Sequence, residues 1–376
     1  MSLQTQTNTR QTPDRLYYDI QIQNIVSTTT PPPQITYFEE RNTPILYTPS
    51  DYMLSIVRFE INTSSCIPIF IPEIQPGTLA QHPNLTVYSV TLFYNNIAYQ
   101  TFVEWIPQNS YIAPPSPLNS GAQNNISQYY NCYDYQWFVN QINTTLATSF
   151  ANIKTANPTL EATNAPFIQW DSIGDIAVLN ADAQFFDQSL AQHIDIYFNN
   201  SLYNLFCSLQ AQYCDYGAPY GMNKKLIILN NLSGSNSIQL PISTPTYTSI
   251  QSTGQSCVDV WTCISSVVFT SNSLPIVSNQ LGTPLIFLDG NHSTSLSNGS
   301  SIALIITDMI ASDNYRPSVL FEPYYMRQVS LVSESPLRKI DIQVFMKLKN
   351  GDFIPMVLPS GGACSIKICF SKKGTI

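Results

Sequence analysis

The C-terminal stretch 340–348 alternates apolar and mostly polar side chains, which is the period of a β-strand with one buried face. Five large apolar residues share that face: Ile340, Ile342, Val344, Met346 and Leu348. A pairing slip of one residue would turn all five toward water, so the register of this strand is firmly specified. We expect the rest of the chain to pair with this strand or to pack against it.

A hairpin is predicted directly after this strand. Asn350-Gly351 is the dipeptide that best tolerates the positive φ angles of a type I′ turn, so we expect a two-residue loop. Such a loop sets three cross-strand pairs: Lys349 with Asp352, Leu348 with Phe353, and Val344 with Val357. Pro355 lacks an N–H group and is expected at a sheet edge or a bulge. A diglycine turn at 361–362 then leads into a third alternating strand, 365–370.

Longer elements are also predicted upstream. Residues 52–61 are largely apolar on both faces, so this strand is expected to be central in its sheet. Residues 85–94 and 97–105 flank two asparagines and predict a second hairpin. In 135–153 the apolar residues recur every four positions, which indicates an amphipathic helix packed on a core.

Shorter elements fill the remaining chain. Asn200 or Ser201 is expected to cap a second helix. Tyr324 to Leu331 is expected to lead into the closing hairpin. Short strands are expected at 167–170, 194–198, 226–229, 237–241, 261–270, 274–277, 285–288 and 302–309, with 261–270 and 274–277 paired to each other.

These elements predict a mainly β, antiparallel fold in which the helices are confined to the middle of the chain. We divide the chain into four parts: an extended N-terminal arm (1–45), a first part of a β-sandwich (46–106), an insertion with two helices and short strands (107–256), and the C-terminal part of the sandwich (257–376). The arm is rich in Gln, Thr and Asn and has no core of its own, so it is expected to be either unrestrained or held by another subunit.

The composition limits the classes of partner. Only 11% of the residues are charged, aromatic residues reach 12%, and the formal net charge is −8. A negative chain has no overall attraction for nucleic acid, so no specific nucleic-acid partner is expected. Few charges and many tyrosines favour a surface covered by neighbouring subunits. An ordinary secreted β protein with few charges fits this composition equally well.

The N-terminal residues 1–12 are polar, without the apolar segment of a signal peptide, and no apolar run reaches the length of a membrane span. These features predict synthesis in a cytosol, where the eight cysteines stay reduced. The cysteines form no C-x-x-C pair, so no zinc or other metal site is expected.

Candidate catalytic residues are few. The chain has three histidines, His82, His193 and His292, none of them in an H-x-x-x-H pattern, and the close carboxylates Asp182 and Asp187 are an ordinary chance pairing. Neither G-x-S-x-G nor a P-loop is present. We therefore predict that the protein is not an enzyme, with no catalytic, cofactor-binding or metal-ligating residue and no cofactor. A pocket that joins a histidine to a carboxylate would argue against this prediction.

Two stretches resemble a known family. "DVWTCISSVVFTSNSLPIVSNQ" and "SESPLRKIDIQVFMKLKNGDFIPMVLPSGGACSIKICFSKK" are similar to C-terminal regions of viral capsid proteins, in particular the penton-type jelly-roll proteins of polinton-like viruses, adintoviruses and virophages. The resemblance covers roughly residues 257–376 and lies in hydrophobicity and turn residues, without a catalytic motif.

The resemblance implies a jelly-roll sandwich and a structural role in an icosahedral virion, most simply as a vertex protein that forms a homo-oligomer (a pentamer) and contacts other capsid proteins. A single jelly roll needs far fewer than 376 residues, so the excess is assigned to the arm and the insertion. The alternatives are a double jelly roll, which would suit a major capsid protein, a receptor-binding spike or adhesin that forms trimers, and a carbohydrate-active β enzyme. A host receptor is a further possible partner.

Overall fold

The chain forms two compact units. One, called the sandwich, combines Met1–Ile67 with Ile264–Ile376, and the other, called the inserted unit, is Pro68–Cys263. The computed structural model describes residues 13–25, 32–62, 67–174, 176–214, 219, 221–229, 247–251, 258–277, 285–286, 301–302, 304–310 and 318–374. The expected strand 237–241 and His292 lie outside these residues.

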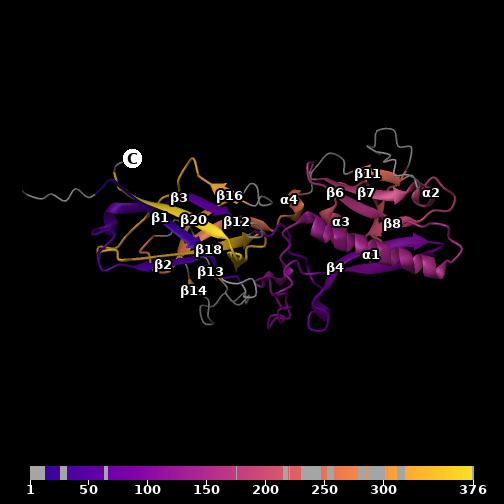
Figure 1. The fold of residues 1–376 in the computed structure, drawn as a ribbon, viewed down its shortest axis with the longest axis horizontal. Helices are drawn as coiled ribbons and strands as arrows, with labels where there is room; N and C mark the ends of the chain where they lie inside the picture. The colour runs from indigo at the N-terminus through magenta and orange to yellow at the C-terminus, as the bar shows by residue number, and fades with distance from the viewer. Residues whose placement is uncertain are drawn as a thin grey trace, which may run out of the picture. The chain divides into compact units, whose positions relative to one another are not determined.

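Two antiparallel sheets make up the sandwich (Figure 1). The first has the order β1 (Arg15–Gln23), β20 (Ala363–Lys372), β3 (Tyr52–Asn62) and β16 (Ser318–Phe321), with β17 (Val329–Ser330) also paired to β3. The second has the order β15 (Leu304–Met309), β12 (Ile264–Ser271), β18 (Lys339–Leu348) and β19 (Phe353–Pro355), with β2 (Thr36–Glu40) also paired to β18. A separate pair joins β13 (Leu285–Ile286) to β14 (Ser301–Ile302). The predicted mainly β, antiparallel class is confirmed.

The core of the sandwich lies between these sheets. Phe59 of β3 and Phe269 of β12 meet edge to face, with ring centroids 5.1 Å apart. The five apolar residues of one face of 340–348 are all buried, so the predicted face of β18 is confirmed. The prediction that β3 is central is also confirmed, because β20 flanks it on one side and β16 and β17 on the other.

The predicted two-residue hairpin loop is wrong. Lys347 pairs with Phe353 and Phe345 with Pro355, one residue away from the expected register. The loop has three residues because Gly351 alone takes a positive φ, +97°, while the Asn350 side chain accepts a hydrogen bond from the N–H of Asp352 (3.0 Å). This is a turn followed by a left-handed glycine, the commonest three-residue hairpin loop. Pro355 lies on an edge strand, as expected.

The third strand of the expected C-terminal sheet belongs to the opposite sheet. β20 pairs with β1 and β3 instead of β19, so the diglycine turn carries the chain across the sandwich. Asn24 holds this turn: its N–H donates to Gly362 O (3.0 Å), its carbonyl accepts from Gly361 N–H (2.8 Å), and its side-chain amide donates to Leu358 O (2.7 Å).

The described part of the N-terminal arm is built into the sandwich of its own chain. β1 pairs with β20 from Arg15↔Ser371 to Gln23↔Ala363, and β2 pairs with β18 over five residues. The expectation of an arm without a core is therefore corrected for these residues. The reason is a period of two in β1, which buries Ile20 completely and places alternate side chains toward the core.

The expected pairing of 261–270 with 274–277 is also corrected. Residues Val258–Trp261 form a short helix, α4, and β12 begins at Ile264. Segment 274–277 instead lies beside the chain that follows β17, where Ile276 and Leu331 form an isolated β-bridge. The turn between them is held by Asp341 of β18, whose carboxylate accepts hydrogen bonds from Asn272 N–H (2.7 Å) and Ser273 N–H (3.0 Å).

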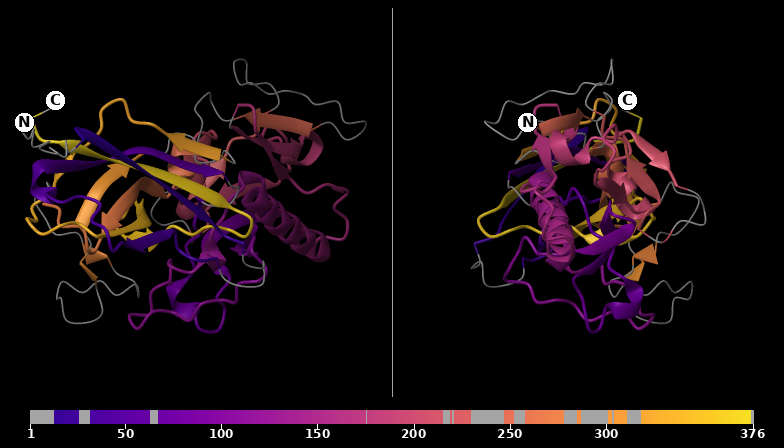
Figure 2. Two further views of the ribbon diagram at one scale, coloured as in Figure 1. Left: turned by 60° about the vertical axis from the view of Figure 1, so that its left-hand side comes forward. Right: turned by 90° about the vertical axis from the view of Figure 1, so that its right-hand side faces the viewer.

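The inserted unit contains two more sheets and the long helix α1 (Tyr135–Ala156). One sheet has the order β5 (Ile97–Glu104), β4 (Leu85–Tyr94), β8 (Asp195–Phe198), β10 (Lys224–Leu226) and β9 (Ala211–Tyr213). The other has the order β11 (Tyr247–Gln251), β7 (Ile176–Asp182) and β6 (Phe167–Asp171). Helix α1 packs on β4 and β5 of the first sheet and on β6 of the second (Figure 2). Such a mixed unit is not a second jelly roll, so the double jelly roll does not describe the fold.

Local signals of the inserted unit agree with the sequence. Asn95 and Asn96 both take positive φ angles, 49° and 63°, so they form the predicted hairpin turn between β4 and β5. Asp134 caps α1 by accepting from Gln136 N–H (2.9 Å). The second predicted helix is α3 (Asn200–Leu205), but its cap is Asn199, one residue earlier than expected. Short helices α2 (Ala183–Phe186), η1 (Pro49–Asp51), η2 (Pro76–Thr78) and η3 (Gln128–Tyr130) complete the described elements.

The bounds of the two units differ from the four expected parts. Hairpin β4–β5 was assigned to the sandwich part 46–106, yet β4 pairs with β8 from Val90↔Phe198 to Phe93↔Asp195. This long-range pairing places the hairpin in the inserted unit, which therefore begins at Pro68 and ends at Cys263 instead of spanning 107–256.

The aromatic centre of the inserted unit is Trp261 of α4, which is 1% exposed. Its indole N–H donates to Leu205 O (2.7 Å). Five other rings have centroids within 5.3–6.0 Å of it: Phe70, Tyr135, Phe138, Trp170 and Phe206. These rings come from segments far apart in sequence, so Trp261 connects most of the unit's core.

Candidate assembly surface

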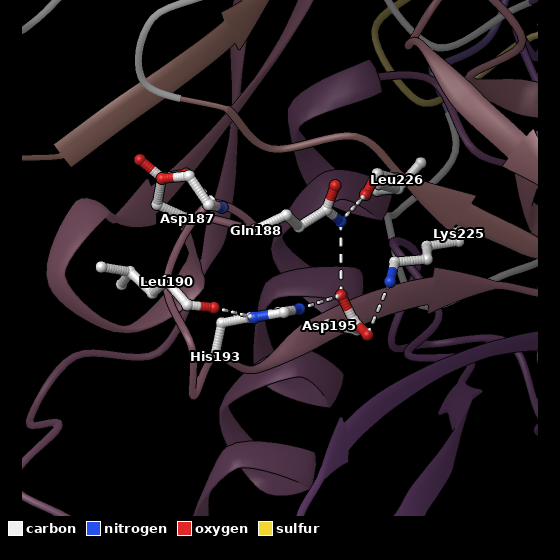
Figure 3. A network of polar contacts seen from close by, with 8 residues as sticks. Asp187, Gln188, Leu190, His193, Asp195, Lys225 and Leu226 are labelled. Carbon is white, nitrogen blue, oxygen red and sulfur yellow. Dashed lines mark hydrogen bonds and ion pairs between the residues drawn. The ribbon is translucent and has the colours of Figure 1, made fainter.

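The carboxylates considered as catalytic candidates have local structural roles. Asp182 caps α2 by accepting from Gln184 N–H (3.0 Å), and Asp187 accepts from Ser189 N–H (2.9 Å). His82 is exposed in the turn after η2. Asp187 belongs to the same loop as His193, but the carboxylate that the structure places against the His193 ring is that of Asp195 (Figure 3). Within the described ranges, no group of three or more His, Cys, Asp or Glu side chains could hold a metal ion, and no helix is long and apolar enough to cross a membrane.

One histidine does meet a carboxylate (Figure 3). His193 Nε2 lies 3.2 Å from Asp195 Oδ1, and Lys225 Nζ lies 2.8 Å from Asp195 Oδ2. Gln188 Nε2 donates to Asp195 Oδ1 (3.3 Å) and to Leu226 O (2.8 Å). Sequence reasoning missed Asp195 and Lys225, and the only signal was the spacing of His193 and Asp195 at the start of a strand.

All contacts of this network lie within one chain. The second ring nitrogen of His193, Nδ1, lies 2.9 Å from Leu190 O, so both nitrogens face acceptors of the chain. A general base needs a nitrogen within reach of a substrate proton. The arrangement instead ties β8, β10 and the 187–193 loop together through a partly buried ion pair, in which removal of one partner would leave the other charge uncompensated.

The sandwich has two lateral sides, where the outer strands of its sheets lie. We call the side formed by β1 and β2 the N-terminal side. Tyr18 Oη and Tyr37 Oη are 2.9 Å apart there and join the two strands, while Arg41 Nη2 donates to Tyr18 Oη (3.1 Å) and Arg41 Nε to Glu39 Oε1 (2.6 Å). Tyr37 also donates to Glu39. Burial raises the pKa of Tyr37, and Arg41 opposes that shift.

The opposite side is formed by β15, β16, β17 and the segment 322–328, and we call it the β15–β17 side. Arg327 forms an ion pair with Asp308 of β15, which joins the second sheet to the segment between β16 and β17. Beyond this link stand Tyr324 and Tyr325, 91% and 86% exposed, with rings that meet edge to face at 4.8 Å. Leu320 and Met326 are exposed beside them. Tyrosine is enriched in protein interfaces relative to the rest of the protein surface.

A jelly-roll sandwich whose lateral sides are open to neighbours is the architecture of one class of virus capsid subunit. The chain belongs to the family described as Sputnik minor capsid protein V18/19, whose model matches residues 16–372.

Individual relatives agree with this membership. Uncharacterized protein V18 of Sputnik virophage is 37% identical over 147 residues, which are 38% of this chain and 86% of V18. Structural protein V19 of Sputnik virophage is 24% identical over 211 residues, which are 54% of this chain and 93% of V19.

Two solved structures share the fold. A chain of the Sputnik virophage particle, determined by cryo-EM, superposes with a TM-score of 0.77 at 27% identity, over 96% of this chain and 99% of that chain. The mavirus penton protein superposes with a TM-score of 0.60 at 15% identity, over 96% of this chain and 100% of that chain. These likenesses cover both units, and the predicted resemblance to virophage penton-type capsid proteins is confirmed.

Proposed function

We propose that the protein is a penton-type capsid protein, which occupies the vertices of an icosahedral virion as a homopentamer and contacts the surrounding major capsid protein. The observation that carries the proposal is the match over 96% of the chain to a subunit of the Sputnik virophage particle. The fold shared with the mavirus penton protein supports the vertex position in particular. In this proposal the role is structural and involves no catalysis, cofactor or membrane span. A host receptor is a further proposed partner, which would bind the parts of the protein exposed on the virion.

The surface of the sandwich fits this role. Closed rings of identical subunits need two different contact surfaces on each copy, related by a fixed rotation. The N-terminal side and the β15–β17 side are two such surfaces, formed by the opposite edges of both sheets. Contacts of ordinary size become long-lived when every subunit makes several at once.

We expect the purified chain to form five-membered rings, measured by native mass spectrometry over a range of concentrations. A mass of three copies would favour the spike or adhesin alternative, and a chain that stays monomeric at all concentrations would contradict self-assembly.

In purified virions, quantitative mass spectrometry is expected to find this chain in a fixed, minor ratio to the major capsid protein. Its absence from washed particles would contradict the capsid role.

A further inference from the structure

The ring of His193 lies between two oxygen atoms of its own chain (Figure 3). Its Nδ1 is 2.9 Å from the carbonyl oxygen of Leu190, and its Nε2 is 3.2 Å from Oδ1 of Asp195. Both oxygens are hydrogen-bond acceptors, so each needs an N–H group in front of it. A neutral imidazole carries one N–H and one lone pair, whereas the protonated ring carries two N–H groups. Only the protonated ring can therefore donate to both oxygens at once.

The charged groups around this ring decide whether it can hold a proton. Asp195 on β8 offers a carboxylate, and Lys225 on β10 contacts the other oxygen of that carboxylate, Oδ2, at 2.8 Å. Asp187 at the start of the loop accepts from a backbone N–H of the loop (2.9 Å). The Lys225 ammonium opposes a second positive charge, but the carboxylate lies between the two cations and has an oxygen for each. The arrangement accommodates a protonated His193 without leaving either cation unpaired.

The ring holds an exposed part of the loop 187–193, which connects α2 to β8. The loop is anchored at its start by Gln188, whose backbone N–H and side-chain amide donate to carbonyl oxygens in and just after β10 (2.9 and 2.8 Å). At its end, Ile194 N–H donates to a carbonyl of α2 (2.7 Å). The four residues between Gln188 and His193 are exposed, and the ring links one of them, Leu190, to β8. Loss of one ring contact therefore loosens the exposed part of the loop while its two ends stay attached.

We propose that His193 acts as a pH-dependent latch, which is closed when the ring is protonated and joins the 187–193 loop to Asp195. Histidine changes its charge between about pH 5 and pH 8, which no other side chain does unless its environment alters it. The closed latch binds a proton that the open latch lacks, so rising pH opens it and falling pH closes it. The inserted unit thus has a surface segment whose order depends on the acidity of the medium. This property is additional to the capsid role and does not depend on it.

Hydrogen exchange of the full chain, followed by mass spectrometry at about pH 5 and about pH 8, tests the latch. The observed rates are compared with the intrinsic exchange rates at each pH, which gives protection factors for the two conditions. We expect the protection factors of segment 188–194 to be roughly tenfold higher at the lower pH, the change expected for one charge-assisted hydrogen bond. Those of α1 and β4, in the core of the same unit, should be equal at the two pH values.

Two substitutions separate the latch from other effects of pH. His193→Gln removes the titrating ring, so the loop is expected to have the low protection factors of the open latch at both pH values. His82→Gln is the matched control, because it removes an exposed histidine of the same unit and should keep the pH dependence of the wild type. Equal protection of the wild-type loop at both pH values would overturn the proposal, as would a pH dependence that persists in His193→Gln or disappears in His82→Gln. The wild-type comparison needs no variant, so the proposal remains testable if a substitution impairs folding.

Discussion

Replacing Asp341 by alanine is expected to lower the free energy of unfolding of the sandwich by about 3 kcal/mol, because a buried carboxylate loses several charge-assisted hydrogen bonds at once. Asp341 is 8% exposed and accepts four hydrogen bonds from the turn after β12. Two come from the N–H groups of Asn272 and Ser273, and two from the hydroxyls of Ser271 and Ser273. Without the carboxylate, the buried hydroxyl of Ser271 loses its acceptor, and the turn residues Asn272 and Ser273 lose the contacts that tie them to β18. All four tryptophans lie in the inserted unit, so hydrogen exchange of β12 and β18 in increasing urea, followed by mass spectrometry, measures the change.

The same carboxylate gives the stability a defined pH dependence. Burial alone would raise the pKa of Asp341, but the hydroxyls of Ser271 and Ser273 and the two backbone N–H groups outweigh it and hold the pKa below its usual value. A group with a depressed folded-state pKa stabilises the protein above its unfolded-state pKa, and that contribution is lost as the pH falls through the folded-state pKa. The wild type is therefore expected to lose stability below about pH 4 more steeply than Asp341→Asn.

Glu334→Gln provides the control, because it removes a carboxylate at an exposed position of the same unit. It should change the free energy of unfolding by no more than about 0.5 kcal/mol. If Asp341→Asn and Glu334→Gln showed equal stability and equal acid sensitivity, the hydrogen bonds from the turn after β12 to Asp341 would not stabilise the sandwich as described.

Replacing Trp261 by alanine is expected to cost about 3–5 kcal/mol, the range for removing a large aromatic side chain from a packed core. The loss should be confined to the inserted unit, because its core cluster contains Trp261 and lies wholly within Pro68–Cys263. Hydrogen exchange followed by mass spectrometry should show faster exchange in α1, β4 and β8, while β18 and β20 keep the protection of the wild type.

Trp137→Ala is the matched comparison, since Trp137 is only partly buried and its indole N–H donates to Ile106 O (2.8 Å). Its effect should be clearly smaller than that of Trp261→Ala. Faster exchange throughout both units in Trp261→Ala would show that they unfold as one, against the division of the core described above.

The strands and helices that a local period defines were predictable from the sequence. The alternation of 340–348, the two asparagines between β4 and β5 and the four-residue period of α1 each depend on neighbouring residues alone. The register of the hairpin at 350–351 could not be predicted, because Asn350-Gly351 is compatible with both a two-residue and a three-residue loop. In the structure only Gly351 of the pair takes the left-handed conformation, which gives the three-residue loop.

Features set by distant residues could not be predicted. The partner of β1 lies about 350 positions along the chain, and the pairing of β4 with β8 that fixes the bounds of the inserted unit spans about 100. The same holds for the link between Asp195 and Lys225. The β15–β17 side was also missed, because Tyr324 and Tyr325 were expected to lead into a strand, and only the folded chain shows how exposed they are.

A cryo-EM reconstruction of the virion, with this chain fitted to its density, tests the account most directly. The account predicts five copies of this chain around each vertex, in contact with the surrounding major capsid protein. Density for the chain as isolated copies on the outer surface, or a shell that lacks it, would contradict the account.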